Sequence, residues 1–198
     1  KKIKMNLKNH IVICNWSSRG YRLLELLQSC QEVSGKAEII VLADKDLYPS
    51  LSHIDESKYY LVSKSPWEIS GLEDAKVTTA KTVLIMQPDN CQTDQSCDPA
   101  VTHYSESADG TVMRTALSVY SYVLKKAGNK PDKVKCNILA EVFDPDKRDL
   151  LLDIGVHETI VSRDIGMSLL AQAVTCPGIT AFFNEVMDPS PNSNEIYF

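Results

Sequence analysis

Short apolar runs recur along the chain and alternate with segments of helical periodicity. The runs predict six strands, at residues 11–14, 39–43, 59–62, 82–86, 137–142 and 159–161. Most of these runs lack regular polar alternation, which is typical of strands that are buried on both faces, as in a parallel sheet.

Helical spacing fills most of the intervals between these strands. Apolar residues return at this spacing at Leu23, Leu26, Leu27 and Cys30, and again at Val112, Ala116, Val119, Tyr120 and Val123. Shorter helices are predicted at about 66–75 and 145–154, and the hydroxyls of Ser17 and Ser18 are predicted to cap the first helix. The alternation predicts an α/β fold, a Rossmann-like doubly wound parallel sheet whose ligand crevice lies at the carboxyl ends of the strands.

Two segments depart from this rhythm. Residues 87–110 are polar and rich in Asp, Asn, Ser and Cys, which predicts a long loop. Near the end of the chain, a helix is predicted at 165–174 and is interrupted by Cys176-Pro177-Gly178. A second helix follows, with an apolar stripe of Ile179, Phe182, Phe183 and Val186. We therefore expect a lobe at 1–162 and a C-terminal helix-turn-helix crossover at 163–198, whose stripe packs against a partner subunit or back on its own sheet.

Composition removes several classes of function. The net charge is −5 and no basic patch dominates, so nucleic acid is not an expected partner. No apolar run approaches the roughly 18 residues that a membrane span needs. The six cysteines form no CxxC pair, and we expect reduced, buried thiols. Nucleophile-elbow, HExxH and Walker motifs are absent from the sequence.

The turn after the first predicted strand occupies the position of a phosphate-binding loop. The dinucleotide fingerprint G-x-G-x-x-G would fall on Asn15, Ser17 and Gly20, so only the third glycine is present. Asn15 tolerates the positive φ of a tight turn, whereas the Ser17 side chain stands where a pyrophosphate would approach the backbone. Free N–H groups remain available to phosphate, and Arg19 adds a cation.

Asp44 ends the second predicted strand, where an acidic residue would bind a ribose hydroxyl pair. An aspartate there favours NAD or an adenine nucleotide over NADP, whose 2′-phosphate it repels. These residues alone fit a crevice that holds a nucleotide and equally one that is empty.

Several stretches resemble the RCK domains, the regulators of potassium conductance, and the related KTN domains of the TrkA-N type. The run from Asn9 to Trp16 resembles their opening, with Asn15 where the family usually has glycine. Residues 109–117 resemble the helix after their fourth strand, and 138–141 and 150–161 resemble the end of their first lobe. The last residues, 194–198, resemble the entry to their smaller second lobe.

This resemblance implies a ligand-sensing regulatory domain that gates a potassium channel or transporter and is not an enzyme. It implies a cytoplasmic position beneath a pore domain, as a soluble domain of a membrane protein. It also implies a homo-oligomer, a dimer that builds to a tetrameric or octameric ring through the helix pair. The expected nucleotide-binding residues are Asn15, Trp16, Ser17, Ser18, Arg19, Gly20, Asp44, Lys45, Gln87, Pro88 and Glu141.

Metal binding is less expected. Some members of the family bind calcium through carboxylates at the ends of the fourth and fifth strands, but Met86 occupies the first of these positions and only Glu141 remains. The polar insertion offers Asp89, Asp94, Asp98, Glu106 and Asp109 as an alternative cation site, although a solvated loop is the simpler interpretation. Zinc at Cys91, Cys97 and His103 is disfavoured by the wide spacing.

Two other functions remain as alternatives. One is an assembly scaffold with an empty crevice and calcium sensing elsewhere, which the loss of two fingerprint glycines favours. The other is an NAD-dependent oxidoreductase, which would need a substrate domain and an acid–base residue facing the nicotinamide.

Overall fold

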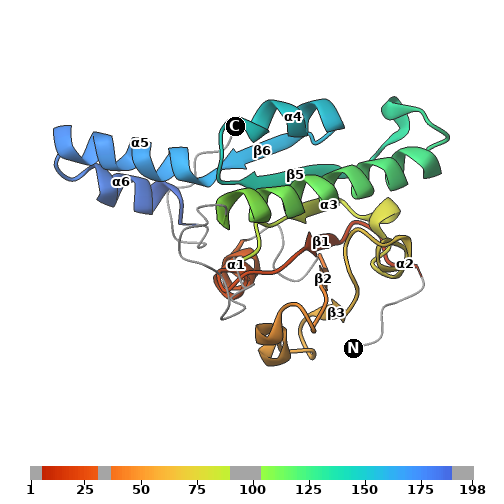
Figure 1. The fold of residues 1–198 in the computed structure, drawn as a ribbon. Helices are drawn as coiled ribbons and strands as arrows, with labels where there is room; N and C mark the ends of the chain where they lie inside the picture. Colours follow the sequence, from red (N-terminus) through yellow and green to blue (C-terminus); the bar gives the residue numbers. More distant parts are fainter. Residues whose placement is uncertain (1–5, 31–36, 90–103, 189–198) are drawn as a thin grey trace. The chain divides into compact units, whose positions relative to one another are not determined.

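A computed structural model describes residues 6–30, 37–89 and 104–188. Figure 1 shows these residues as a ribbon coloured along the sequence. The chain divides into two compact units. The larger contains Lys1–Ser18 and Glu38–Val161, and the smaller contains Arg19–Ala37 and Ser162–Phe198. The expected boundary between 1–162 and 163–198 stays a prediction.

The larger unit is built on six parallel strands in the order β3-β2-β1-β4-β5-β6. Their bounds are Ile11–Cys14 (β1), Ile39–Leu42 (β2), Tyr60–Val62 (β3), Thr82–Ile85 (β4), Asn137–Val142 (β5) and Glu158–Val161 (β6). All six strands were predicted, each to within one residue at both ends. This order reverses between β1 and β4, which defines the doubly wound Rossmann-like sheet.

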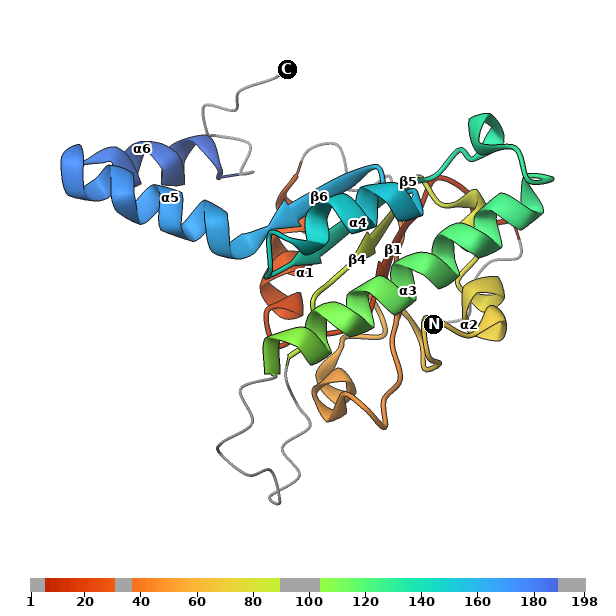
Figure 2. The ribbon, with the colours of Figure 1, turned by 45° about the horizontal axis from the view of Figure 1, so that its top comes forward.

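Three helices of the larger unit lie next to one another along the sheet (Figure 2). They are α2 (Ile69–Asp74), α3 (Tyr104–Lys126) and α4 (Lys147–Ile154), and short 3-10 turns occupy Pro49–His53 (η1), Val77–Thr79 (η2) and Pro131–Lys133 (η3). Helix α3 contacts β4 and β5 as well as α2 and α4. Four of the five apolar α3 residues predicted to share one face are buried, whereas Tyr120 is half-buried.

The core explains why the apolar runs form strands. Every residue of β1 and β2 is buried, as expected for central strands covered on both sides. Strand β6 lies at the end of the strand order and is only half-buried on alternate residues. The apolar residues of β1, β4 and β5 join those of α3 in one continuous cluster that includes Val12, Ile85, Val112 and Ile138.

The smaller unit contains α1 (Gly20–Ser29), α5 (Ser162–Thr175) and α6 (Ile179–Val186). Helices α5 and α6 contact each other, and neither contains a buried residue. Within the predicted stripe, Ile179, Phe183 and Val186 are half-buried and Phe182 is exposed. No helix among the described residues is long and apolar enough to cross a membrane.

Three details of the prediction were wrong. Helix α3 begins at Tyr104, so residues 104–110 of the predicted 87–110 loop are helical and Asp109 lies in that helix. The N-cap position of α1 is Arg19, and no side chain caps this helix. Cysteine burial was only partly predicted: Cys14 and Cys136 are buried free thiols, but Cys176 is exposed and Cys30 is half-buried.

Candidate functional site at the carboxyl edge of the sheet

The sheet brings four chain segments to one edge. In register, Cys14 of β1 lies beside Leu42 of β2 and Ile85 of β4, and Ile85 lies beside Ala140 of β5. The residues that follow these positions are 15–18, 43–46, 86–89 and 141–144. Because the strand order reverses between β1 and β4, the ligand crevice of this fold class lies here.

Asn15 makes the turn that follows β1. Its φ of 63° lies in the left-handed region, as predicted for an asparagine in the place of the first glycine. Its side chain is buried, and Nδ2 donates to the Met86 carbonyl across 3.1 Å. Thr115 Oγ1 donates to Asn15 Oδ1 at 3.3 Å. Asn15 therefore joins β1, β4 and α3, which a glycine could not do.

The next residues of the loop differ sharply in exposure. Trp16 and Ser17 are buried, whereas Ser18 is exposed. The Ser18 N–H donates to Asp89 Oδ2, and the Ser18 hydroxyl donates to Asp89 Oδ1 at 3.2 Å. The hydroxyl predicted as a helix cap is thus bonded to a carboxylate from the segment after β4. Arg19 and Gly20 belong to the smaller unit, so their proposed roles stay predictions.

Asp44 is held in a defined turn after β2. Its Oδ1 accepts the Asp46 N–H at 3.0 Å, and its carbonyl accepts the N–H groups of Leu47 and Tyr48. The side chain is half-buried. These bonds fix the carboxylate at the strand end where a ribose hydroxyl pair would need an acceptor.

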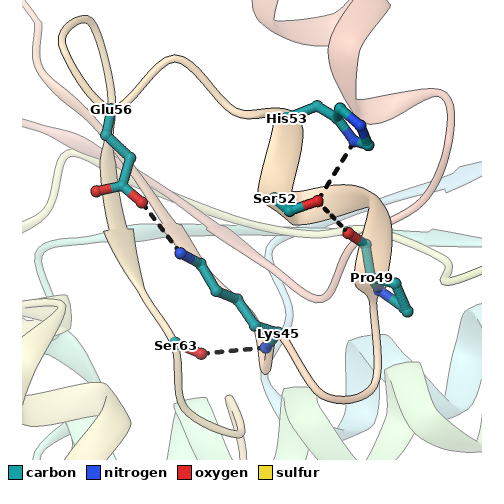
Figure 3. A network of polar contacts seen from close by, with 6 residues as sticks. All are labelled: Lys45, Pro49, Ser52, His53, Glu56 and Ser63. Atoms are coloured by element: carbon teal, nitrogen blue, oxygen red, sulfur yellow. Dashed lines mark hydrogen bonds and ion pairs between the residues drawn. The ribbon is translucent and has the colours of Figure 1, made fainter.

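Lys45 is engaged on the β3 side of this turn. Its N–H donates to Ser63 Oγ at 3.1 Å, and its ammonium group pairs with Glu56 Oε1 at 3.0 Å (Figure 3). The hydrogen bond and the positive charge of Lys45 lower the pKa of Glu56. In the same view, the Ser52 hydroxyl donates to the Pro49 carbonyl within η1. A phosphate seeking the Lys45 ammonium would have to compete with Glu56.

The ends of β4 and β5 are joined by a network that the sequence did not predict. The Gln87 N–H donates to Glu141 Oε2 at 3.3 Å, and Gln87 Nε2 donates to Asp109 Oδ1 at 2.7 Å. Asp109 is fully buried and also accepts the N–H groups of Phe143 at 3.0 Å and Asp144 at 2.9 Å. Three donors offset the cost of burying this side chain. Pro88, next to Gln87, is buried.

The geometry gives little support to a metal centre. Met86, at the end of β4 where calcium binding was expected to need a carboxylate, is buried. Among the described residues, no group of three or more His, Cys, Asp or Glu is arranged to bind a metal ion. Cys91, Cys97, His103, Asp94 and Asp98 lie outside the described residues, as does the side chain of Glu106. Asp89 and Asp109 accept N–H groups instead.

Hydrogen-bond acceptors and donors lie together at this edge. Asp44 and Glu141 supply carboxylate acceptors, and the loop after β1 supplies N–H and hydroxyl donors. Asp109 and Thr115 were missed as members of this region. The sequence carried one signal for them, the 109–117 stretch that resembles the family's helix after the fourth strand.

The sequence matches ion channels over nearly its whole length. It is 24% identical to the ion channel POLLUX of Lotus japonicus over 189 residues, which cover 91% of this chain and 18% of that protein. It is 22% identical to TvoK, a calcium-gated potassium channel of Thermoplasma volcanium, over 91% of this chain and 44% of that protein. The chain thus spans about a fifth of the length of the plant channels that it matches. No protein-family model matches it.

Solved structures share the fold. GsuK bound to ADP aligns with a TM-score of 0.59 and 19% identity, over 88% of this chain and 37% of that one. The GsuK RCK domain aligns with a TM-score of 0.53 and 17% identity, over 80% and 27%. The TrkA-N domain of the inner membrane protein YbaL from Escherichia coli aligns with a TM-score of 0.57 and 13% identity, over 84% and 98%.

The sequence matches and the fold agree with the resemblance found at 9–16, 109–117 and 138–161. The chain is similar in sequence to ion channels and shares the fold of solved RCK and TrkA-N domains.

Proposed function

We propose that this chain is the ligand-sensing regulatory domain of a potassium channel or transporter and that it binds NAD or an adenine nucleotide at the carboxyl edge of the sheet. It acts at the cytoplasmic face of the membrane and catalyses no reaction. The observation that carries the proposal is the Asp44 carboxylate, held at the end of β2 beside the reversal point of the sheet.

The ribose and the phosphates each have a candidate partner at this edge. The ribose hydroxyls donate to Asp44, and a phosphate accepts from N–H groups at Ser17 and Ser18. Trp16 and Asn15 shape the turn, while Lys45, Gln87, Pro88 and Glu141 border the crevice. GsuK, which shares the fold, has been solved bound to ADP and bound to NAD, and this supports a nucleotide as the ligand class.

Ligand binding would regulate a pore by differential affinity. A nucleotide that binds one arrangement of the assembled domains more tightly than another shifts the equilibrium toward that arrangement. No proton acceptor, nucleophile or metal is needed for this role. An NAD-dependent oxidoreductase remains the less favoured alternative, and turnover with any hydride donor would revive it.

Calorimetry with the purified domain tests the proposal. The titrants are NAD, NADH, ATP, ADP, AMP and calcium, and the variants are Asp44→Ala and, as a matched control far from the carboxyl edge, Asp132→Ala in η3. We expect saturable binding of one nucleotide that is lost in Asp44→Ala and kept in Asp132→Ala. At a hundredfold excess over Kd, the nucleotide should stabilise the domain by about 2.7 kcal/mol. A flat response to every nucleotide contradicts the proposal and leaves calcium or assembly.

A second role, assembly, has its own observation. Helices α5 and α6 expose large apolar side chains: Ile165 at 51%, Leu170 at 59%, Val174 at 84% and Phe182 at 55%. Exposed apolar patches of this kind are typical of interaction surfaces. We propose that these helices pair with a second copy of the chain and that the pairs build a ring of four or eight below a pore domain.

Light scattering tests this assembly. We expect a dimer or larger species for the native chain and a smaller species for Leu170→Glu. Exposed Gln172→Glu on the same helix supplies the control for added charge. A native chain that stays monomeric at high concentration contradicts the assembly role.

A further inference from the structure

The phosphate-binding loop already holds an anion supplied by the chain itself. Asp89 accepts the Ser18 N–H on one carboxylate oxygen and the Ser18 hydroxyl, at 3.2 Å, on the other. Ser18 is exposed and Asp89 is half-buried, so solvent reaches the pair. The two residues are separated by 71 positions in the sequence, and the parallel pairing of β1 with β4 brings their segments together.

A carboxylate in this position competes with a phosphate for the same donors. Both groups are anions whose oxygens accept from backbone N–H and hydroxyl groups. The Ser18 N–H and hydroxyl cannot serve a phosphate while they are bonded to Asp89. A phosphate brought to Ser18 without moving Asp89 would also meet a like charge at short range, which is unfavourable.

We propose that Asp89 is an internal competitor that a nucleotide phosphate must displace from Ser18, so that Asp89 sets both the affinity and the charge preference of the loop. This inference rests on the proposed function, because it assumes that the loop after β1 is where the nucleotide's phosphates bind. It adds a specificity-determining residue that lies outside the dinucleotide fingerprint and outside the expected binding residues.

Displacement of Asp89 on ligand binding would also change the structure at the end of β4. Asp89 lies two residues beyond Gln87, whose N–H bonds Glu141 and whose side chain bonds Asp109. Asp109 in turn accepts the N–H groups of Phe143 and Asp144 beyond β5. The free and bound states therefore differ in the segment that connects the loop to two strand ends, and a sensor needs such a difference.

The experiment compares Asp89→Asn and Asp89→Ala with the native domain and with the charge-matched control Asp132→Asn. Asp132 is an exposed residue that precedes β5 at the opposite end of that strand. The probes are pyrophosphate, ADP and NAD, titrated calorimetrically at low ionic strength, where charge effects are largest. We expect Asp89→Asn to bind pyrophosphate and ADP about tenfold more tightly than the native domain, because one nearby negative charge is removed. Asp132→Asn should bind as the native domain does.

A second measurement follows the contact without any nucleotide. Hydrogen exchange of the Ser18 amide should be faster in Asp89→Ala than in the native domain, since its acceptor is removed. Adding pyrophosphate to Asp89→Asn should slow this exchange again. Circular dichroism confirms that each variant is folded before the titrations are interpreted.

The outcomes separate this inference from the proposed function. If the native domain binds ADP or NAD and both Asp89 variants bind no more tightly, the inference is overturned and nucleotide sensing stands. If the native domain binds no nucleotide but Asp89→Asn binds pyrophosphate, the inference is supported and the proposed function fails for the native chain. If folded Asp89→Asn does not bind pyrophosphate, the loop is not a phosphate site and the inference is overturned.

Discussion

The Thr115 hydroxyl donates a hydrogen bond to Asn15 Oδ1 across 3.3 Å and so ties helix α3 to the turn after β1. Both residues are buried, and the Asn15 amide nitrogen simultaneously donates to the Met86 carbonyl. The residue that replaces the first fingerprint glycine is therefore a structural junction. These two hydrogen bonds explain why asparagine rather than glycine occupies position 15.

Substitutions at this junction should separate backbone strain from hydrogen bonding. Asn15→Gly keeps the positive φ without strain but loses two side-chain bonds, so we expect a loss of about 1–3 kcal/mol in the free energy of unfolding. Asn15→Ala should lose about 1 kcal/mol more because φ is 63°. Urea unfolding measures both. Thr115→Val should cost about 1 kcal/mol, and its effect should shrink when Asn15 is already Gly. If the effects of Thr115→Val and Asn15→Gly on the free energy of unfolding were additive, a direct bond between the two side chains would be contradicted.

Gly155 ends α4 in a position that admits no side chain. Its φ is 110°, and a Cβ added there would lie 2.4 Å from the Tyr120 ring of α3. We expect Gly155→Ala to destabilise the domain by about 2 kcal/mol or more, through both strain and overlap. Gly110→Ala is the control, because the space around Gly110 is open and it lies within helix α3. That change should stabilise by about 0.5–1 kcal/mol. Equal effects in thermal unfolding would refute this interpretation.

Burial of His10 predicts a dependence of stability on pH. Burial lowers the pKa of His10, against the opposing effects of the bond to the Ala75 carbonyl and of the Glu38 charge. The unfolded chain, with a value near 6.5, therefore takes up the proton first as the pH falls. This contribution to stability is present in full above about pH 6.5 and is lost as the pH falls from there through the folded-state value.

The variant His10→Gln isolates this effect. Glutamine keeps a donor for the Ala75 carbonyl but does not titrate. We expect the free energy of unfolding to fall less steeply between pH 7 and pH 5 in His10→Gln than in the native domain. Parallel curves from urea unfolding at several pH values would assign the pH dependence to other groups.

The free cysteines should differ widely in reactivity. Burial raises the pKa of Cys14 to about 12 and also raises the pKa of Cys136. Both thiols are therefore protonated at pH 8 as well as inaccessible. We expect iodoacetamide to alkylate the exposed Cys176 in the folded domain and to reach Cys14 and Cys136 only after unfolding in urea. Peptide mapping by mass spectrometry identifies the modified residues. Alkylation of Cys14 without denaturant would contradict its burial.

The central strands were predictable because their runs are continuously apolar. Ile11–Cys14 and Ile39–Leu42 are buried at every position, so one-dimensional hydrophobicity suffices to find them. The start of α3 was missed because Tyr104 and its neighbours carry polar residues typical of a loop. Periodicity becomes visible only where that helix reaches the core, at Ala108 and Val112.

The candidate site was less predictable than the fold. The positions of Asn15, Asp44 and Gln87 follow from the strand ends, which the pattern locates. The partners of Asp109 and Ser18 do not follow from the sequence. Asp109 accepts from the Gln87 side chain and two backbone N–H groups, and Ser18 donates to the Asp89 carboxylate. Local sequence holds no signal for the bond between Ser18 and Asp89, which are 71 positions apart.

The single carboxylate of Asp109 binds groups from two strand ends that are far apart in the sequence. The residues that bind Asp109 should therefore tolerate substitution to different degrees. The Phe143 and Asp144 partners are main-chain groups that almost any residue supplies, whereas the Gln87 partner is a side chain that a single mutation removes. Among related chains, positions 87 and 109 should change as a pair, and positions 143 and 144 should drift freely. A lineage that replaces the aspartate with an apolar residue must supply other acceptors for the N–H groups of Phe143 and Asp144 or leave them to water.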